Sequence, residues 1–121
     1  MYDYRSYYEK IVETLDNMGI GIEIKTSPDL SCFVDLSTFT IYIPDIYDDE
    51  EKFWCLLHES GHMLVHMDGK DNGISDLTDT VINEVLAWDY SRDVLLWARI
   101  QIDDTTFYLK MREAIEDYLN T

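Results

Sequence analysis

Residues 50–66, EEKFWCLLHESGHMLVH, decide how this chain is organised. The acidic residues at positions 48–51 suit the positively charged end of a helix dipole. Residues 53–57 and 63–65 are apolar on nearly all sides of a helix, which is typical of a helix buried at the centre of a small domain. We therefore predict a central helix over residues 50–66.

An H-E-x-x-H motif lies inside this helix, at His58, Glu59 and His62. Residues four apart stand one above the other on a helix, so the two imidazoles can bind one metal ion. Glu59 points about 100° further round the helix, where it can reach a water molecule on the metal without binding the metal itself. We predict that His58 and His62 bind Zn²⁺ and that Glu59 is the general base. The alternative is a surface helix with incidental histidines, which fits poorly because buried histidines and a buried carboxylate need polar partners.

Two histidines leave a catalytic zinc ion one protein ligand short. Glu84 is the best candidate, because it lies early in the next long helix, which can return antiparallel to the first. Gly61 on one helix and Ala87 and Ser91 on the other are small, so the two backbones can approach closely enough for a carboxylate to join both imidazoles. The alternatives are the nearby acids Asp79 and Asp89.

Upstream of the central helix, the sequence predicts one helix and a small sheet. Apolar residues recur at helical spacing over residues 3–18, and Gly19 suits a C-terminal cap. Residues 20–25 alternate between isoleucine and other residues, which is typical of a strand. Residues 32–36 and 39–43 predict a hairpin, which Pro44 ends.

Downstream, a turn-rich loop over residues 67–78 leads to two further helices. Thr78 or Asp79 can cap the first, which continues to residue 99, and the second is amphipathic over residues 103–119. One hydrophobic core is the normal solution for a chain of 121 residues. We therefore predict a single α+β domain over residues 1–121, in which a small antiparallel three-stranded sheet packs on four helices.

The composition limits the partners and the location of the protein. Asp and Glu number 25 against 9 Lys and Arg, which gives a formal net charge of −16. That field repels phosphate backbones and attracts basic proteins, so we expect no direct binding of nucleic acid; a merely solvated acidic surface is the alternative.

The apolar runs are too short to span a membrane, and the N-terminus carries no signal-peptide pattern. Two cysteines suit a reducing compartment, so we expect a cytoplasmic protein.

The motif residues resemble the ImmA/IrrE family of small zinc metallopeptidases. The family's H-E-L-G-H-x-L-L-H signature is similar to residues 58–66, HESGHMLVH. Its second motif, E-x-x-A-N-x-F-A, is similar to residues 84–91, EVLAWDYS, which keep Glu84 and Ala87 but carry Trp88 in place of Asn. Residues 40–44, TIYIP, are similar to the strand that precedes the family's active helix. The resemblance covers roughly residues 20–95.

This resemblance implies a zincin-like fold and a zinc-dependent endopeptidase that acts on one specific protein, a helix-turn-helix transcriptional repressor of a phage or mobile element. We expect the substrate to lie extended along residues 39–43, used as an edge strand. The competing hypothesis is a non-catalytic zinc-containing interaction module, such as a toxin–antitoxin partner or an acidic inhibitor of a DNA-binding protein. The intact Glu59 counts against a pure scaffold, which has no use for that carboxylate beside a metal.

Four other features of the sequence bear on the site. His66 suits a supporting or capping role, because three successive imidazoles on a straight helix cannot converge on one tetrahedral ion. Cys55 is interpreted as a small buried hydrophobic residue. Residues 68–79 resemble an EF-hand loop, but Lys70 stands where an oxygen ligand belongs, so a connector is the better interpretation. The oxyanion-stabilising residue is unassigned, with three candidates: Tyr42, Tyr47 and Tyr90.

Overall fold

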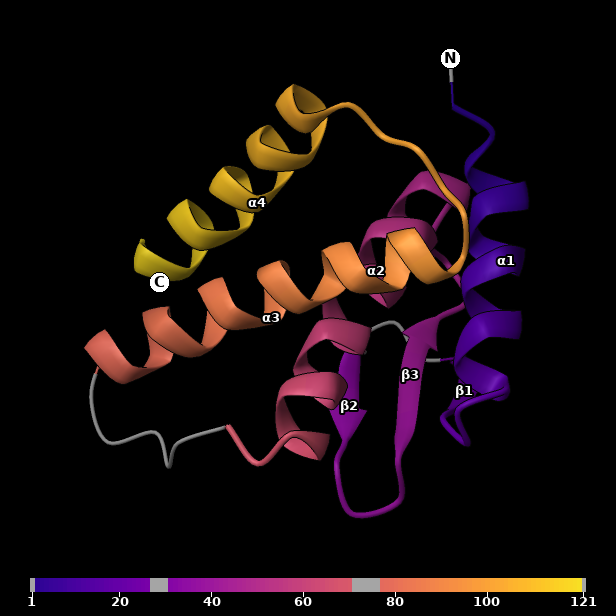
Figure 1. Cartoon of the computed structure of the whole chain (residues 1–121), viewed down its shortest axis with the longest axis horizontal. Coiled ribbons are helices and arrows are strands. Elements are labelled where there is room, and N and C mark those ends of the chain that lie inside the picture. The colour runs from indigo at the N-terminus through magenta and orange to yellow at the C-terminus, as the bar shows by residue number, and fades with distance from the viewer. Residues whose placement is uncertain (1, 27–30, 71–76, 121) are drawn as a thin grey trace.

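The chain folds as a group of helices packed against a small sheet. The computed structural model describes residues 2–26, 31–70 and 77–120. Within these ranges there are four helices and three strands, which confirms the predicted α+β class (Figure 1). In chain order they are α1 (Tyr4–Asp16), β1 (Gly21–Lys25), β2 (Phe33–Asp35), β3 (Thr40–Pro44), α2 (Asp49–Met67), α3 (Leu77–Trp97) and α4 (Asp104–Leu119).

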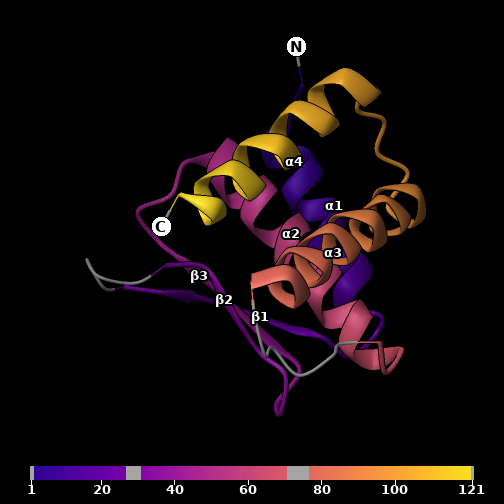
Figure 2. The same ribbon diagram turned by 90° about the vertical axis from the view of Figure 1, so that its left-hand side faces the viewer.

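Helix α2 is the predicted central helix, and it begins with a capping box. The carboxylate of Asp48 accepts a hydrogen bond from the N–H of Glu51 at 2.8 Å, and the carboxylate of Glu51 accepts one from the N–H of Asp48 at 3.1 Å. This exchange satisfies two amide groups that a helix start otherwise leaves unpaired. Helix α2 packs against α1, α3 and the sheet, and Figure 2 shows it between the sheet and α4. The predicted bounds are confirmed to within one residue at each end.

The sheet is mixed, so the prediction of a wholly antiparallel sheet is wrong. The strand order is β1-β3-β2. The predicted hairpin is confirmed, because β2 pairs antiparallel with β3, but β1 pairs parallel with β3. Strand β3 carries Ile41 and Ile43, both fully buried, whereas Ile24 of β1 is 47% exposed. The most apolar strand, β3, lies in the middle of the sheet. The chain passes from β1 to the opposite edge, where it forms β2, and the hairpin then places β3 between them.

This strand order corrects the predicted substrate strand. Residues 39–43 fall mostly in β3, whose two sides are both hydrogen-bonded to neighbouring strands, so that segment cannot add another strand. Strand β2 is an edge of the sheet, and it also packs against α2. An extended peptide therefore has a place beside β2 rather than beside β3.

Helix α3 begins earlier than the sequence predicts. It starts at Leu77, so Thr78 and Asp79 lie in its first turn and do not precede it as caps. Residues 71–76, which form half of the predicted connector and half of the EF-hand-like loop, lie outside the described residues. Neither interpretation of that loop is therefore tested.

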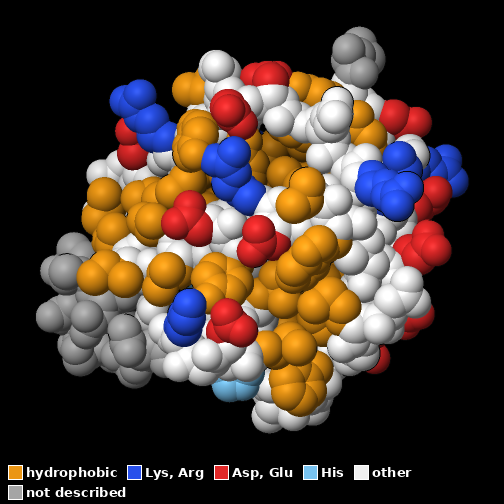
Figure 3. Space-filling model, viewed as in Figure 1, with side chains coloured by type: hydrophobic (Ala, Val, Ile, Leu, Met, Phe, Trp, Pro, Cys, Tyr) orange, Lys and Arg blue, Asp and Glu red, His pale blue; other side chains and the backbone are white. Residues whose placement is uncertain are grey.

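Helix α4 is attached to the rest of the fold mainly through its first half. Phe107 is 3% exposed and its ring centroid lies 5.7 Å from that of Trp88 in an edge-to-face contact. The described helices lack the combination of length and apolar character that a membrane span needs. On the face drawn in Figure 3, apolar side chains reach the surface among charged side chains of both signs.

The start of α4 is fixed by the carboxylate of Asp103, its N-cap residue. It accepts hydrogen bonds from the hydroxyl of Tyr2 and from the backbone N–H and hydroxyl of Thr106. These bonds, led by that from Tyr2, lower the pKa of Asp103 to about 2. Tyr2 lies ahead of α1, so this one carboxylate joins the chain before α1 to the start of α4.

We predict that Asp103→Asn lowers the melting temperature at pH 7 and that the difference from wild type shrinks in acid. A depressed pKa in the folded state means that the ionised carboxylate stabilises the protein above its usual value of 3.8, and that this stabilisation is lost as the pH falls towards 2. Thermal unfolding followed by circular dichroism from pH 7 to pH 3 measures the effect, with exposed Asp89→Asn as the control. An undiminished difference at pH 3 would contradict the assignment.

Candidate metal centre

The contact between α2 and α3 brings the predicted site residues together. A Cβ atom added to Gly61 would lie 1.9 Å from the carbonyl oxygen of Ala87, which no side chain can tolerate. Ala87 and Ser91 are fully buried on the facing helix. The two backbones therefore touch at this point, as the small residues in the sequence predict, and side chains on either side of the contact can meet across it.

Glu84 reaches both histidines across this contact. One of its carboxylate oxygens, Oε2, lies 2.7 Å from Nε2 of His58, and the other, Oε1, lies 3.1 Å from Nε2 of His62. The two Nε2 atoms are 3.2 Å apart, and one ligand atom from each residue falls within 4.8 Å of the others. The structure thus assembles the three residues that the sequence predicts as metal ligands.

The donor set fits a zinc ion. Two imidazole nitrogens and one carboxylate oxygen are the protein ligands of a common class of catalytic zinc site, which keeps a fourth position open. The side chains of His58, His62 and Glu84 are 22%, 24% and 16% exposed, so the group is sheltered but still reachable from solvent. Asp89, one of the alternatives named from the sequence, does not belong to this group, and the side chain of Asp79, the other, lies outside the described part of the chain.

The pKa values of Glu84 and His62 are each shifted in the direction that favours the charged form. Burial acts to raise the pKa of Glu84, but its hydrogen bonds with His58 and His62 outweigh burial and lower that pKa to about 2. Burial acts to lower the pKa of His62, but the carboxylates of Glu84 and Glu59 raise it overall. A buried carboxylate is costly unless a polar or charged partner compensates it. In this structure the imidazoles compensate Glu84, and a bound cation would take over that role.

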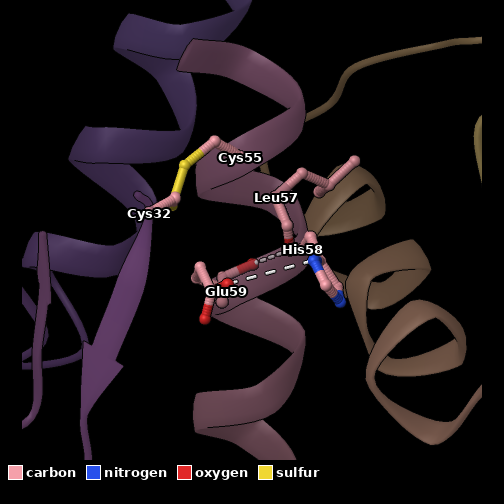
Figure 4. The surroundings of a disulfide bond; sticks show 6 residues. Cys32, Cys55, Leu57, His58 and Glu59 are labelled. Carbon is pink, nitrogen blue, oxygen red and sulfur yellow. Dashed lines mark hydrogen bonds and ion pairs between the residues drawn. A yellow bond between two sulfur atoms is a disulfide. The ribbon is translucent and has the colours of Figure 1, made fainter. Parts of the chain in front are cut away.

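Glu59 lies next to the cluster without joining it. Its side chain is only 13% exposed, and its Oε1 is 3.9 Å from Nδ1 of His58. Figure 4 shows Glu59 on the side of α2 that faces the strand just after Cys32, while His58 points towards the neighbouring helices. Burial raises the pKa of Glu59, and a raised carboxylate pKa suits a group that accepts and returns a proton near neutral pH.

Trp88 supports His58, a role that the sequence interpretation missed. The indole and imidazole rings are stacked, with centroids 4.8 Å apart and planes 10° apart. Trp88 is 2% exposed, so the buried indole fixes the plane of the His58 ring by stacking on one of its faces. The available signal was its position, four residues after Glu84, which places both on one face of α3.

A disulfide bond links the residue just before β2 to the helix that carries the site. Cys32 and Cys55 are bonded, with Cα atoms 6.2 Å apart (Figure 4). The interpretation of Cys55 as a plain buried hydrophobic residue is therefore wrong, because a partner distant in sequence lies within bonding reach. The bond fixes the chain just before edge strand β2 to α2 at a point three residues before His58.

His66 and the three candidate tyrosines make contacts with other parts of the fold. His66 is in the last turn of α2, and its ring centroid is 6.4 Å from that of Phe39. Tyr42 stacks on Phe33, and Tyr90 donates a hydrogen bond to Asp68 at 2.7 Å. Tyr47 packs against the core. These contacts give each tyrosine a structural role and leave the oxyanion stabiliser unassigned.

Comparison with protein-family models, with curated proteins and with solved structures finds no match to this chain. The interpretation of the site therefore depends on its own residues and geometry.

We predict that the purified protein binds one zinc ion per chain and that Glu84→Ala weakens binding by more than about 100-fold, because even changes outside the ligands commonly cost about 10–100-fold. Competition with a zinc chelator of known affinity measures this, together with zinc content after dialysis. Glu59→Gln and Asp89→Asn are matched controls that should keep wild-type affinity. Equal affinity in Glu84→Ala and wild type would remove Glu84 from the ligand set.

Proposed function

We propose that this protein is a zinc-dependent endopeptidase with a zincin-like fold, in which His58, His62 and Glu84 hold the metal and Glu59 is the general base. The observation that carries the proposal is the meeting of two imidazoles and one carboxylate from adjacent helices, with a second, buried carboxylate beside them that is not part of the group. A purely structural zinc site would need four protein ligands and no such neighbour.

The chemistry divides between the metal and Glu59. Zinc bound at these residues supplies Lewis-acid polarisation of a peptide carbonyl and lowers the pKa of a bound water to about 7. Glu59 accepts a proton on its carboxylate and returns it to the departing amine. Trp88 keeps the His58 ring in place, because the indole stacks on the face of the imidazole.

The substrate strand is proposed to pair with β2. This strand is an edge of the sheet, and the Cys32–Cys55 disulfide attaches the residue just before it to α2. A peptide added to β2 would use backbone hydrogen bonds for affinity and leave its side chains to determine specificity. A protein substrate with an accessible extended segment fits this arrangement.

The substrate class is proposed to be a basic DNA-binding protein, in particular a helix-turn-helix repressor of a phage or mobile element. Two features support this class: the similarity of residues 58–66 and 84–91 to the ImmA/IrrE motifs, and the net charge of −16. A strongly acidic protein attracts a basic partner and increases its association rate.

Such a repressor acts on DNA, so the proposal places this protein in the cytoplasm as well. The Cys32–Cys55 disulfide is an unusual feature for that compartment, where thiols are normally kept reduced. The cysteines can therefore be thiols in the cell without any change to the metal ligands, none of which is a cysteine.

We predict that the zinc-loaded wild-type protein cleaves a helix-turn-helix repressor encoded beside it, and that Glu59→Gln cleaves it about 10²–10⁴-fold more slowly, since that is the usual contribution of a general base. Mass spectrometry of the products over time measures the rate. Glu50→Gln, the same change at an exposed position of α2, is the control and should keep the wild-type rate.

Two results would contradict the proposal. Equal cleavage by Glu59→Gln and wild type, at equal zinc content, would show that Glu59 is not the base. Tight binding of the repressor with no cleavage by the zinc-loaded wild type would favour the non-catalytic interaction module.

A further inference from the structure

A small hollow adjoins the metal centre on the side of α4. It measures about 210 Å³, and His58 forms part of its wall. The buried part of the wall is aromatic, formed by Trp54 and Trp88, which are 5% and 2% exposed. Pockets for whole small-molecule ligands are usually about 300–1,000 Å³, so this hollow has the size for a single side chain.

The opposite wall is a charged face of α4. Lys110, Glu113, Ala114 and Asp117 line it, and their spacing of three and four residues places them on one side of the helix. A helix face that packs against tryptophans is normally apolar. Here only Ala114 is apolar, and its small side chain leaves the space between α4 and α2 unfilled.

The charges on this face are those that would hold a cation. Nζ of Lys110 lies 6.0 Å from the centre of the Trp54 ring and 3.8 Å from Oε2 of Glu113, so an ammonium group of the chain itself already occupies this environment. Asp117 has no ion pair within the described ranges. Two carboxylates and one ammonium leave the face with a net negative charge, and tryptophan faces attract cations as well.

We propose that this hollow is a subsite for an arginine or lysine side chain of the substrate, next to the bond that is cleaved. The methylene stem packs on Trp54 and Trp88, and the cationic head group meets Asp117 and Glu113. A cationic head group gains the attraction of these carboxylates and of the tryptophan faces, which a neutral side chain does not. The inference rests on the proposed function for the position of the scissile bond, and it narrows the substrate to a sequence with a basic residue at the cleavage site.

The subsite is tested first without metal, using two probes that differ only in charge. Nα-acetyl-arginine methylamide and its neutral analogue Nα-acetyl-citrulline methylamide are titrated into ¹⁵N-labelled metal-free protein. We expect the arginine probe to shift the amide signals of residues 54–58 and 110–117, with an affinity at least about tenfold higher than that of the citrulline probe. Equal affinities, shifts elsewhere or no shifts would overturn the proposal.

Variants of α4 separate the subsite from a general acidic surface. The double variant Glu113→Gln, Asp117→Asn should reduce arginine binding to the level of citrulline. Lys110→Gln should strengthen it, because the competing ammonium is removed. Glu116→Gln is the control, since Glu116 bonds to Arg112 at 2.8 Å and does not line the hollow. Unchanged binding in the first two variants would contradict the assignment.

A third arm distinguishes failure of the subsite from failure of the proposed function. Arginine hydroxamate and norleucine hydroxamate, which carry the same metal-binding group, are titrated into zinc-loaded protein. Preference for the arginine compound supports the subsite beside the metal. Equal affinity for the two hydroxamates overturns the subsite and leaves the metal centre intact. If the protein binds no zinc but the metal-free protein still prefers the arginine probe, the proposed function alone is overturned.

Discussion

The contact between the backbones of α2 and α3 at Gly61 is the constraint on which the rest of the site depends. With no side chain at that position, the carbonyl of Ala87 lies where a Cβ atom would otherwise stand. This close approach lets the short side chain of Glu84 reach His58 and His62 at 2.7 Å and 3.1 Å. Any larger residue at position 61 would separate the helices, and the buried carboxylate would then lose the partners that compensate its burial.

The same helix pair organises the surroundings on both sides. Towards the sheet, the Cys32–Cys55 disulfide attaches the chain before edge strand β2 to α2. Towards α4, Trp88 stacks on His58 and also lines the hollow that we assign to a basic side chain. A peptide lying across the metal centre would therefore meet a strand edge on one side and an aromatic, acidic subsite on the other.

Local patterns in the sequence predicted the centre of the fold well. The helical period and acidic start of residues 50–66 located α2, and the H-E-x-x-H spacing with Glu84 and the small residues Gly61 and Ala87 identified all members of the cluster. The sequence did not reveal the parallel pairing of β1 with β3, because alternation shows that a segment is a strand but not which neighbour it takes. The disulfide depends on a contact between distant segments, which spacing along the chain does not encode. Spacing does place Trp88 on the same face of α3 as Glu84, but it does not show that the indole stacks on His58.

Anomalous diffraction at the zinc edge, from crystals of the zinc-loaded protein, shows whether one metal ion binds between α2 and α3. The proposed site requires one strong peak about 2.0–2.2 Å from Nε2 of His58, Nε2 of His62 and a carboxylate oxygen of Glu84, with Glu59 not bound to the metal. A peak on other residues, or one that Glu84 does not contact, would contradict it.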